Sequence, residues 1–468
     1  MIIIRNAAAI EFEPPRIREG VDIVIEGTTI TAVGPGAGAA AAAAAGKGAS
    51  SAAGKGASGG TGGPGGTGAP KVIDATGRIV YPGIVDSHHH YYSGLARGVT
   101  SAIGPTPDFM SVLKNLWWRM DRAADEENLY SAGLICNLDA IRAGTTSVID
   151  HNASPNFING SLDTLKRSFE KVGIRGATCY EVTDRHGRAD MLAGVEENIA
   201  FAKQIDAEKA AGTWSGLMEA HVGGHAPCTI PDEGLEAIAD AVRRTGRGLH
   251  LHVAEDAYDV SHSHVTYGKN IVPRLDEFGM LNEKTILVHG IHLDSDEVRL
   301  LGERDGFLVH NCRSNMNNGV GYNTKLPEYK NLALGTDGIG GDMFTEFKFA
   351  YFKHKDAKGP WWPGDFMKAL VAGNRILERN FGGKFGLLEP GYAADVVISA
   401  YDPPTPMVPE NLAGHFLYGM DASITRTVIV NGNVVYEEGE FPFDTAEIYA
   451  ESRKQAKKLW EKMETIAP

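Results

Sequence analysis

Histidines and acidic residues occur in this chain at the ends of short apolar segments. The clearest group is Asp86-Ser87-His88-His89-His90, which closes a strand-like segment at 84–90. Side chains alternate along a strand, so His88 and His90 face one side and His89 the other. Two imidazoles on one face can bind a single metal ion. The sequence therefore predicts that His88 and His90 are metal ligands and that His89 is structural.

A second apolar segment contains two more histidines and ends in an acid. It reads Gly248-Leu249-His250-Leu251-His252-Val253-Ala254-Glu255. His252 is predicted to be a third metal ligand, and His250 lies one layer deeper on the same face, as a packing or supporting residue. A carboxylate close to a metal-activated water is a natural proton shuttle. Glu255 is therefore predicted to be catalytic.

Two later segments complete the set of chemical groups. His289 ends the apolar run in Ile286-Leu287-Val288-His289-Gly290-Ile291-His292, where an acid/base or substrate-polarising group is expected. His292 lies beyond the run and is predicted to belong to the loop. Asp337, in Leu334-Gly335-Thr336-Asp337-Gly338, can ligate a metal and accept a proton from water. The predicted metal ligands are thus His88, His90, His252 and Asp337.

These residues must be brought together by the elements that carry them. From 83 to about 389, short apolar segments alternate with helix-like stretches such as 129–143, 161–171, 195–211 and 232–245. Alternation of this kind predicts a parallel sheet, and eight repeats in some 300 residues favour an α/β (β/α)₈ barrel. Barrel active sites lie at the carboxyl ends of the strands. The eight candidate strands are 84–90, 144–151, 174–182, 214–221, 249–255, 285–292, 306–311 and 332–337.

Both ends of the chain add strands outside the barrel. Residues 1–82 read as the first part of a small β domain, and 390–445 as its second part, with a hairpin turn at Asn431-Gly432. We expect the two parts to form one composite β-sandwich domain. Within the first part, 37–70 is a low-complexity tract of Ala, Gly, Ser and Lys, predicted to be an irregular surface insertion. Residues 446–468 are predicted to form a C-terminal helix.

The overall composition and charge disfavour some classes of protein. The 468 residues carry a formal net charge of −14, which disfavours nucleic-acid binding because that usually requires a basic face. No apolar stretch approaches the roughly 18 residues of a membrane span. The four cysteines form no CxxC pair, so a reduced compartment is expected. The sequence predicts a cytoplasmic enzyme without a membrane anchor.

The joint pattern of these motifs resembles the amidohydrolase superfamily. HxH on the first strand, His on the fifth and sixth, and Asp on the eighth are arranged as in that family. Three flanking stretches are also similar to it, and the 37–70 tract is the main departure. They are Tyr81-Pro82-Gly83-Ile84-Val85-Asp86, Leu388-Glu389-Pro390-Gly391-Tyr392-Ala393-Ala394-Asp395 and Val428-Ile429-Val430-Asn431-Gly432.

Within the superfamily, the chain is most similar to the cytosine/guanine deaminase and chlorohydrolase branch. Gly224-His225-Ala226-Pro227 and His310-Asn311-Cys312-Arg313-Ser314-Asn315-Met316 carry this likeness. The second stretch looks especially like aminohydrolases linked to selenium metabolism, whose substrate is not fixed by this likeness. The Pro-Arg-Phe type signature of ordinary guanine deaminases is missing after the fourth strand, so guanine is not the predicted substrate.

Four residues are candidate substrate contacts. His225 and Asn311 belong to the two motifs that carry the branch likeness. Trp117 could form a stacking wall, for which core packing is the alternative. Arg185 could meet an anionic substrate, for which a solvated surface position is the alternative.

The metal count follows from a missing residue. Binuclear members of the superfamily usually bridge two metals through a carbamylated lysine on the fourth strand. That segment reads Gly216-Leu217-Met218-Glu219-Ala220-His221, without lysine, which favours one divalent ion. Glu219 or His221 as a ligand to a second ion is the alternative. Zinc is the expected metal for a His₃Asp set, with iron as the alternative.

The predicted reaction is hydrolytic deamination of an aminated heterocycle of purine, pyrimidine or pterin type, a small-molecule substrate. Asp337 would accept a proton from the metal-activated water, Glu255 would deliver one to the ring and His289 would polarise the site. Hydrolysis of a cyclic amide or carbon–halogen bond by the same site is one alternative. A non-catalytic barrel is another. The resemblance also suggests a homo-oligomer.

Overall fold

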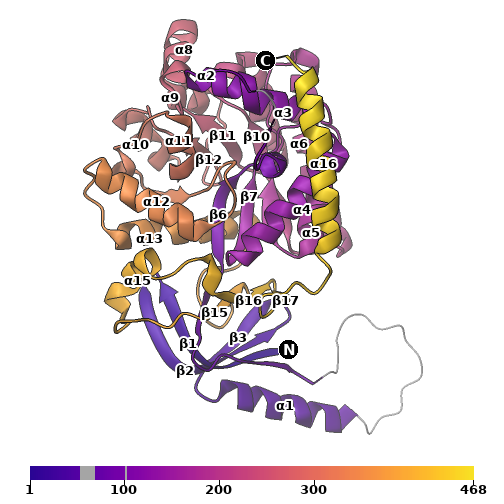
Figure 1. The fold of residues 1–468 in the computed structure, drawn as a ribbon, viewed down its shortest axis with the longest axis vertical. Coiled ribbons are helices and arrows are strands. Elements are labelled where there is room, and N and C mark those ends of the chain that lie inside the picture. The colour runs from indigo at the N-terminus through magenta and orange to yellow at the C-terminus, as the bar shows by residue number, and fades with distance from the viewer. Residues whose placement is uncertain (53–68, 101–102, 468) are drawn as a thin grey trace, which may run out of the picture.

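The protein consists of a barrel layer stacked on a smaller β domain, as the computed structural model shows (Figure 1). The structure describes residues 1–52, 69–100 and 103–467. The N-terminal strands lie in the β domain, the chain then forms the barrel, and it returns to the β domain before α16 (Ala446–Thr465) runs back along the barrel. This confirms the predicted fold class, a barrel with a composite β domain from both termini.

The β domain is one eight-stranded sheet assembled from the two ends of the chain. Its order is β17-β16-β15-β5-β1-β2-β3, with β4 also paired to β1. Buried Ile, Val and Ala side chains of these strands form its core. The strands are β1 (Ile2–Phe12), β2 (Pro15–Glu26), β3 (Thr29–Gly34), β4 (Lys71–Asp74), β5 (Ile79–Pro82), β15 (Val396–Ser399), β16 (Thr425–Val430) and β17 (Asn433–Tyr436).

The barrel strands are parallel and lie at all eight predicted positions. Hydrogen bonds join β6–β9 into one sheet and β10–β14 into another. Isolated parallel bridges join these sheets, Val182 to Gly224 at one seam and His89 to Asp337 at the other. The strands are β6 (Ile84–His89), β7 (Thr145–Asp150), β8 (Arg175–Thr178), β9 (Met218–Ala220), β10 (Val222–Gly224), β11 (Leu249–Val253), β12 (Ile286–His289), β13 (Phe307–His310) and β14 (Leu332–Leu334).

Amphipathic helices cover the outside of the barrel. In α7 (Asp232–Thr245), Leu235, Ile238 and Val242 are buried at helical spacing, and Gly246 ends the helix with a φ of +66°. The other barrel-layer helices are α4 (Glu126–Arg142), α5 (Ser161–Val172), α6 (Arg188–Ala211), α8 (Ala257–Tyr267), α9 (Ile271–Glu277), α10 (Ser295–Glu303), α11 (Cys312–Asn318), α12 (Met343–Asp356), α13 (Pro363–Val371) and α14 (Gly373–Phe381); α15 (Leu412–Tyr418) follows them.

A short helical segment after the first barrel strand covers the mouth of the barrel. It consists of α2 (Phe109–Val112), the π-helical turn η2 (Leu113–Trp117) and α3 (Trp118–Ala123). α16 packs against α3 and α4, with Leu459 and Met463 buried. π-Helical turns occur frequently at functional sites because they reposition side chains.

The low-complexity tract differs in part from the irregular insertion predicted. Residues 37–52 form α1 (Ala37–Ala52), a helix that runs along the β domain (Figure 1). Alanine has the highest helix propensity, and here a run of alanines outweighs the interspersed glycines. Gly38 approaches the sheet closely, and its amide donates a hydrogen bond of 3.0 Å to Asp22 Oδ2. Residues 53–68 of the predicted insertion lie outside the described part of the chain.

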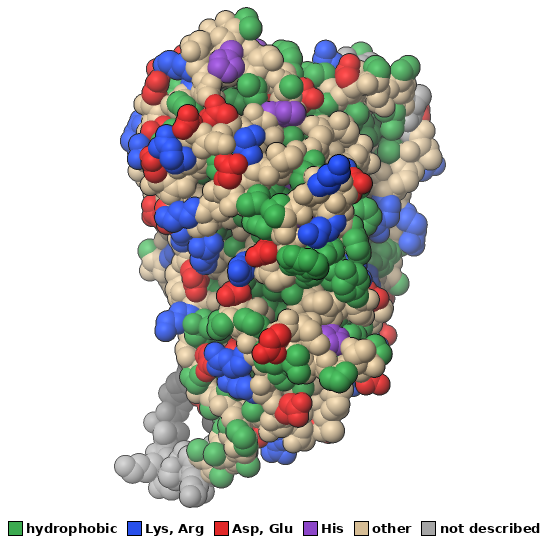
Figure 2. Space-filling view, turned by 90° about the vertical axis from the view of Figure 1, so that its left-hand side faces the viewer, with side chains coloured by type: hydrophobic (Ala, Val, Ile, Leu, Met, Phe, Trp, Pro, Cys, Tyr) green, Lys and Arg blue, Asp and Glu red, His purple; other side chains and the backbone are tan. Residues whose placement is uncertain are grey.

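Aromatic side chains are exposed on the side that carries α12 and α15. Phe349 and Phe352 of α12 and Tyr418 of α15 are 45%, 51% and 68% exposed. Figure 2 shows apolar side chains gathered among charged ones on this side of the molecule. Among the described helices, none has the length and apolar character needed to cross a membrane.

Candidate active site

A pocket lies at the carboxyl ends of the barrel strands, beneath the segment α2–η2–α3. Its walls come from residues that follow six barrel strands and from the covering helices. It is lined by His90, Tyr92, Ser93, Phe109, Leu113, Trp117, Trp118, Glu181, His225, His252, Glu255, His289, Ser314, Asn317, Asn318, Asp337, Gly338 and Ile339. This is the end of the barrel at which the sequence predicted the site.

The four predicted metal ligands meet at one side of this pocket. His252 Nε2 lies 3.1 Å from His90 Nε2 and 3.3 Å from His88 Nε2. Asp337 Oδ1 lies 3.1 Å from His90 Nε2 and 3.8 Å from His88 Nε2. A tetrahedral ion with bonds of about 2.0–2.1 Å would hold its donor atoms about 3.3 Å apart. The donor set therefore fits a divalent metal.

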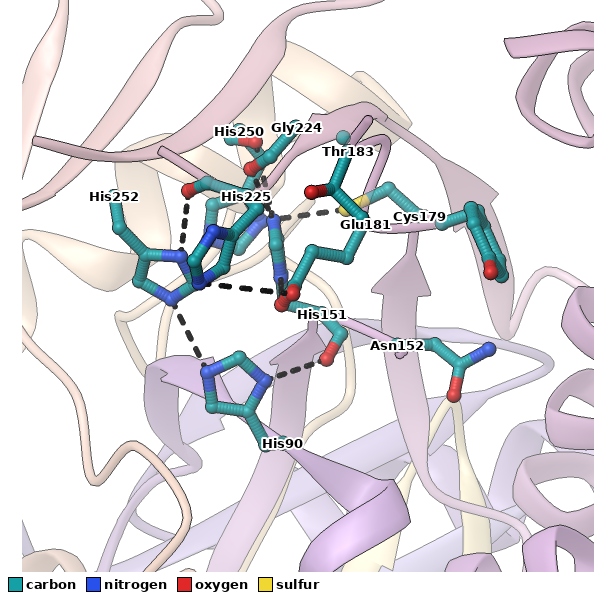
Figure 3. A network of polar contacts seen from close by, with 12 residues as sticks. His90, His151, Asn152, Cys179, Glu181, Thr183, Gly224, His225, His250 and His252 are labelled. Carbon is teal, nitrogen blue, oxygen red and sulfur yellow. Dashed lines mark hydrogen bonds and ion pairs between the residues drawn. The ribbon is translucent and has the colours of Figure 1, made fainter. Parts of the chain in front are cut away.

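The other ring nitrogens of these histidines are held by neighbours. Nδ1 of His90 donates to the carbonyl of His151 at 2.7 Å, and Nδ1 of His252 donates to the carbonyl of His225 at 2.8 Å (Figure 3). A carbonyl only accepts, so each ring carries a proton on Nδ1 and directs its Nε2 at the centre. This is the tautomer that a metal ligand requires.

The protonation of the cluster also suits a cation. Burial lowers the pKa of His88 and His252 well below the usual value, so both are neutral at pH 7. Burial raises the pKa of Asp337, but contacts with His88 and His90 outweigh it and hold the carboxylate ionised. Burial would lower the pKa of His90, yet Asp337 raises it to about 9. A metal ion would displace this proton, because metals bind the deprotonated ring.

His250 supports His88 from below the pocket. His88 Nδ1 lies 2.9 Å from His250 Nε2, and His250 Nδ1 lies 3.8 Å from Cys179 Sγ. A proton on each Nδ1 aligns the chain from His88 to the sulfur and leaves His88 Nε2 free for metal. The sequence placed His250 one layer beneath His252, and the structure gives it a partner on a different strand.

Replacing His250 with alanine is expected to weaken metal binding about 10- to 100-fold, as loss of a group that orients a metal ligand does. Zinc affinity measured by competition with a chromophoric chelator tests this. His264→Ala, which removes an exposed histidine of α8, is the matched control. Unchanged zinc affinity in His250→Ala would show that His88 needs no such support.

The predicted proton-transfer groups stand beside the metal ligands. His289 Nε2 lies 3.5 Å from Glu255 Oε2 and 3.7 Å from Asp337 Oδ2, and Nδ1 donates to Asn315 Oδ1 at 2.8 Å. Burial raises the pKa of Glu255 to about 7, although His289 opposes this. A carboxyl group with a pKa near neutrality can both give and take a proton at physiological pH.

The backbone at these positions is strained. Ala254, His289 and Asp337 have φ angles of 46°, 71° and 53°, in the left-handed region that side chains rarely adopt. Each such residue costs about 1–3 kcal/mol, and such strain clusters at functional sites. All three follow or end barrel strands, and Ala254 immediately precedes Glu255. The strain marks the strand ends where the candidate catalytic groups turn into the pocket.

Two of the four candidate substrate contacts line the pocket. These are His225, whose Nδ1 lies 2.7 Å from Thr229 Oγ1, and the half-buried Trp117. Arg185 lies behind the wall, 3.1 Å from Glu181 and 3.3 Å from Asp121, with its guanidinium 4.7 Å from the Trp118 ring. Asn311 is fully buried outside the pocket lining, and its side-chain amide has no hydrogen-bond partner among the described residues.

Sequence reasoning missed several residues of the site. Ser314 donates to Asp337 Oδ2 at 2.6 Å, and Asn318 donates to Glu255 Oε1 at 3.4 Å. His151 and Glu181, which follow β7 and β8, form an ion pair of 3.2 Å near His90. The pattern that predicts His289 is a polar residue at the carboxyl end of a strand. His151 and Glu181 show the same pattern, so it could have identified them.

The chain is similar to known deaminases. Curated relatives include a 5-methylthioadenosine/S-adenosylhomocysteine deaminase of Thermococcus sibiricus, 29% identical over 78% of this chain and 84% of its own. A 5'-deoxyadenosine deaminase of Methanosarcina barkeri is 26% identical over 84% and 89%.

Solved structures share the fold. A zinc-bound adenosine deaminase of Xanthomonas campestris has a TM-score of 0.79 at 22% identity, covering 98% of both chains. Guanine deaminase of E. coli has a TM-score of 0.73 at 17% identity, covering 93% of this chain and all of that one. The profile of the amidohydrolase family matches residues 79–435. That range holds every candidate ligand and spans most of the sequence, so the chain belongs to the amidohydrolase family.

Proposed function

We propose that the protein is a metal-dependent deaminase that hydrolyses the C–NH₂ bond of a small aminated heterocycle. The observation that carries this is the placement of Glu255 and His289 beside the four-residue donor set, at the wall of one pocket. The names of the curated relatives, deaminases of adenosine derivatives, support the same reaction class. Homo-oligomerisation and a cytoplasmic location stay predictions from the sequence.

Each residue of the site has its own role in the proposed reaction. His88, His90, His252 and Asp337 would hold a divalent metal, which when bound brings the pKa of water from 15.7 toward about 7. Asp337 is placed to take a proton from the attacking water. Glu255 would then protonate a ring nitrogen, and His289 would hold Glu255 and Asp337 in position. Water adds to the carbon, its C–N bond breaks, and the amine leaves as ammonia, with a C=O group as the product.

One zinc ion is the proposed metal content. Glu219 is paired with Arg247 at 3.0 Å and with Lys209, on the far side of β9 from the ligands. His221 is buried, and its ring centre lies 5.8 Å from that of His250. Neither alternative ligand for a second ion belongs to the candidate metal clusters of the described residues. Three imidazoles and a carboxylate are typical zinc ligands, with iron as the alternative.

The proposed function is tested by incubating the zinc-loaded protein with purines, pyrimidines, pterins and their nucleosides, and in parallel with a chlorinated triazine and a cyclic amide. We expect ammonia release from at least one, at a rate that depends on added zinc. Release of halide from a chlorinated triazine, or ring opening of a cyclic amide without ammonia, would assign the site to the alternative hydrolysis. Absence of any turnover with full zinc occupancy would contradict an enzymatic function of this class.

A further inference from the structure

Glu181 places a second carboxylate in the pocket that the proposed reaction does not use. Its side chain is 4% exposed, yet it lines the pocket together with His90 and His225. In Figure 3 its carboxylate lies between the rings of His151 and His225. A buried carboxylate that faces a pocket is costly unless it is paired, so its partners show what it can do.

The neighbours of Glu181 keep it ionised and fix its position. Oε2 lies 3.2 Å from His151 Nδ1, and Oε1 lies 3.1 Å from Arg185 Nη2. Burial alone would raise the pKa of Glu181, but His225, His151 and Arg185 outweigh it and lower the pKa well below its usual value. An ionised carboxylate only accepts hydrogen bonds. Arg185 is thus occupied in holding an acceptor, which leaves it poorly placed to bind an anionic substrate.

The group His90, His151 and Glu181 is not arranged as a second metal site. His151 Nε2 faces two carbonyl oxygens, of Gly224 at 3.1 Å and His250 at 3.2 Å, and therefore carries a proton. His90 Nδ1 donates to the carbonyl of His151. The remaining nitrogens are also engaged: His151 Nδ1 faces the ionised Glu181 carboxylate at 3.2 Å, and His90 Nε2 is directed at His252 and Asp337 of the predicted metal site. Glu181 is therefore the acceptor that this group offers to a ligand.

The position of Glu181 limits which part of a substrate it can reach. One carboxylate oxygen lies 3.9 Å from His225 Nε2, and one lies within 4.8 Å of a ring nitrogen of the metal ligand His90. The donor that Glu181 binds must therefore be close to the reacting carbon. A distant sugar hydroxyl does not meet this condition, whereas a ring N–H beside that carbon does.

We propose that Glu181 accepts a hydrogen bond from a ring N–H next to the reacting carbon, and that the substrate is a 2-amino-4-oxo heterocycle of the guanine or pterin type. In such a ring, the amino carbon stands between an N–H donor and a nitrogen acceptor. Glu181 would accept a hydrogen bond from the ring N–H, and protonated Glu255 would donate to the ring nitrogen on the other side of the amino carbon. A 6-aminopurine lacks an N–H beside its amino carbon. This inference rests on the proposed deaminase function. It departs from the adenosine-type substrates of the named relatives, and also from the sequence-based expectation, in which guanine is not the predicted substrate.

Comparing kcat/KM of the zinc-loaded wild type and Glu181→Gln for guanine, pterin and adenosine tests this assignment. We expect the wild type to prefer guanine or pterin over adenosine by at least about tenfold. Glu181→Gln should lower kcat/KM for that substrate about 10- to 100-fold, the value of a hydrogen bond to a charged group, and change adenosine turnover less than about threefold.

Glu197→Gln is the matched control. Glu197 is also a buried carboxylate, but it accepts from the backbone amides of Gly160 and Leu162, away from the pocket. It should leave the ratio of guanine to adenosine turnover unchanged. An equal loss for both substrates in Glu181→Gln, or a wild-type preference for adenosine, would overturn the assignment while leaving the deaminase function intact.

Binding separates this assignment from the proposed function. Calorimetric titration of pterin into Glu255→Gln and into Glu255→Gln/Glu181→Gln needs no turnover. We expect pterin to bind the double variant at least about tenfold more weakly. If no substrate is deaminated but this difference appears, the deaminase proposal fails and the recognition role of Glu181 stands. Equal pterin affinity in the two variants would overturn that role.

Discussion

Glu255→Gln is expected to lower kcat by about 10² to 10⁴-fold, because it removes the group that would transfer a proton to the substrate ring. The amide keeps the size of the side chain and its contact with Asn318. Zinc content and melting temperature should therefore match the wild type. Initial rates of ammonia release, measured alongside zinc analysis, check this. Turnover within about threefold of wild type would exclude Glu255 as the proton shuttle.

The same residue should set the pH dependence of the reaction. Glu255 has a pKa of about 7, raised mainly by burial, so its protonated form predominates below pH 7. As a general acid it is active in that form, and kcat/KM is expected to fall as the pH rises above about 7. In Glu255→Gln the residual activity should no longer fall as the pH rises above about 7. If kcat/KM of the variant still falls at the same pH, a group other than Glu255 causes the decrease.

Loss of the metal is expected to have the second large effect. Removing zinc with a chelator should reduce activity more than about 100-fold, because the attacking water then loses its activation. One equivalent of zinc should restore full activity, and a requirement for two equivalents would contradict the single-ion proposal. Metal analysis of the purified protein, followed by titration of the apoprotein, provides both measurements.

His252→Ala should give the same loss of activity without a chelator, together with zinc content well below one equivalent. His252 Nε2 is within 3.3 Å of two other predicted ligands, so no neighbour can replace it without moving. His264→Ala, on the exposed face of α8, is the control for loss of a histidine. Full zinc occupancy and normal turnover in His252→Ala would remove it from the ligand set.

The sequence by itself determined the barrel and the candidate metal ligands. Strand alternation placed His88 and His90 on one face, and the position of Asp337 at the end of an apolar segment placed it at the same barrel mouth. The barrel could be predicted in this way because strand periodicity and chain order are local properties, whereas the metal ligands stay a prediction. The alanine-rich tract shows the limit of local reasoning, since helix propensity and glycine content pointed in opposite directions and α1 formed.

Only the tertiary structure decided how the site is completed. The carbonyls of His151 and His225 that orient two ligand rings come from different strands, and backbone groups leave no trace in residue types. Arg185 is a candidate contact for an anionic substrate by sequence, but Asp121 of α3, 64 residues earlier in the chain, pairs with it at 3.3 Å together with the nearby Glu181. Glu181 itself became a candidate for substrate recognition only through its distance from His90 and His225. Such roles depend on contacts between strands far apart in the chain, and the fold fixes those contacts.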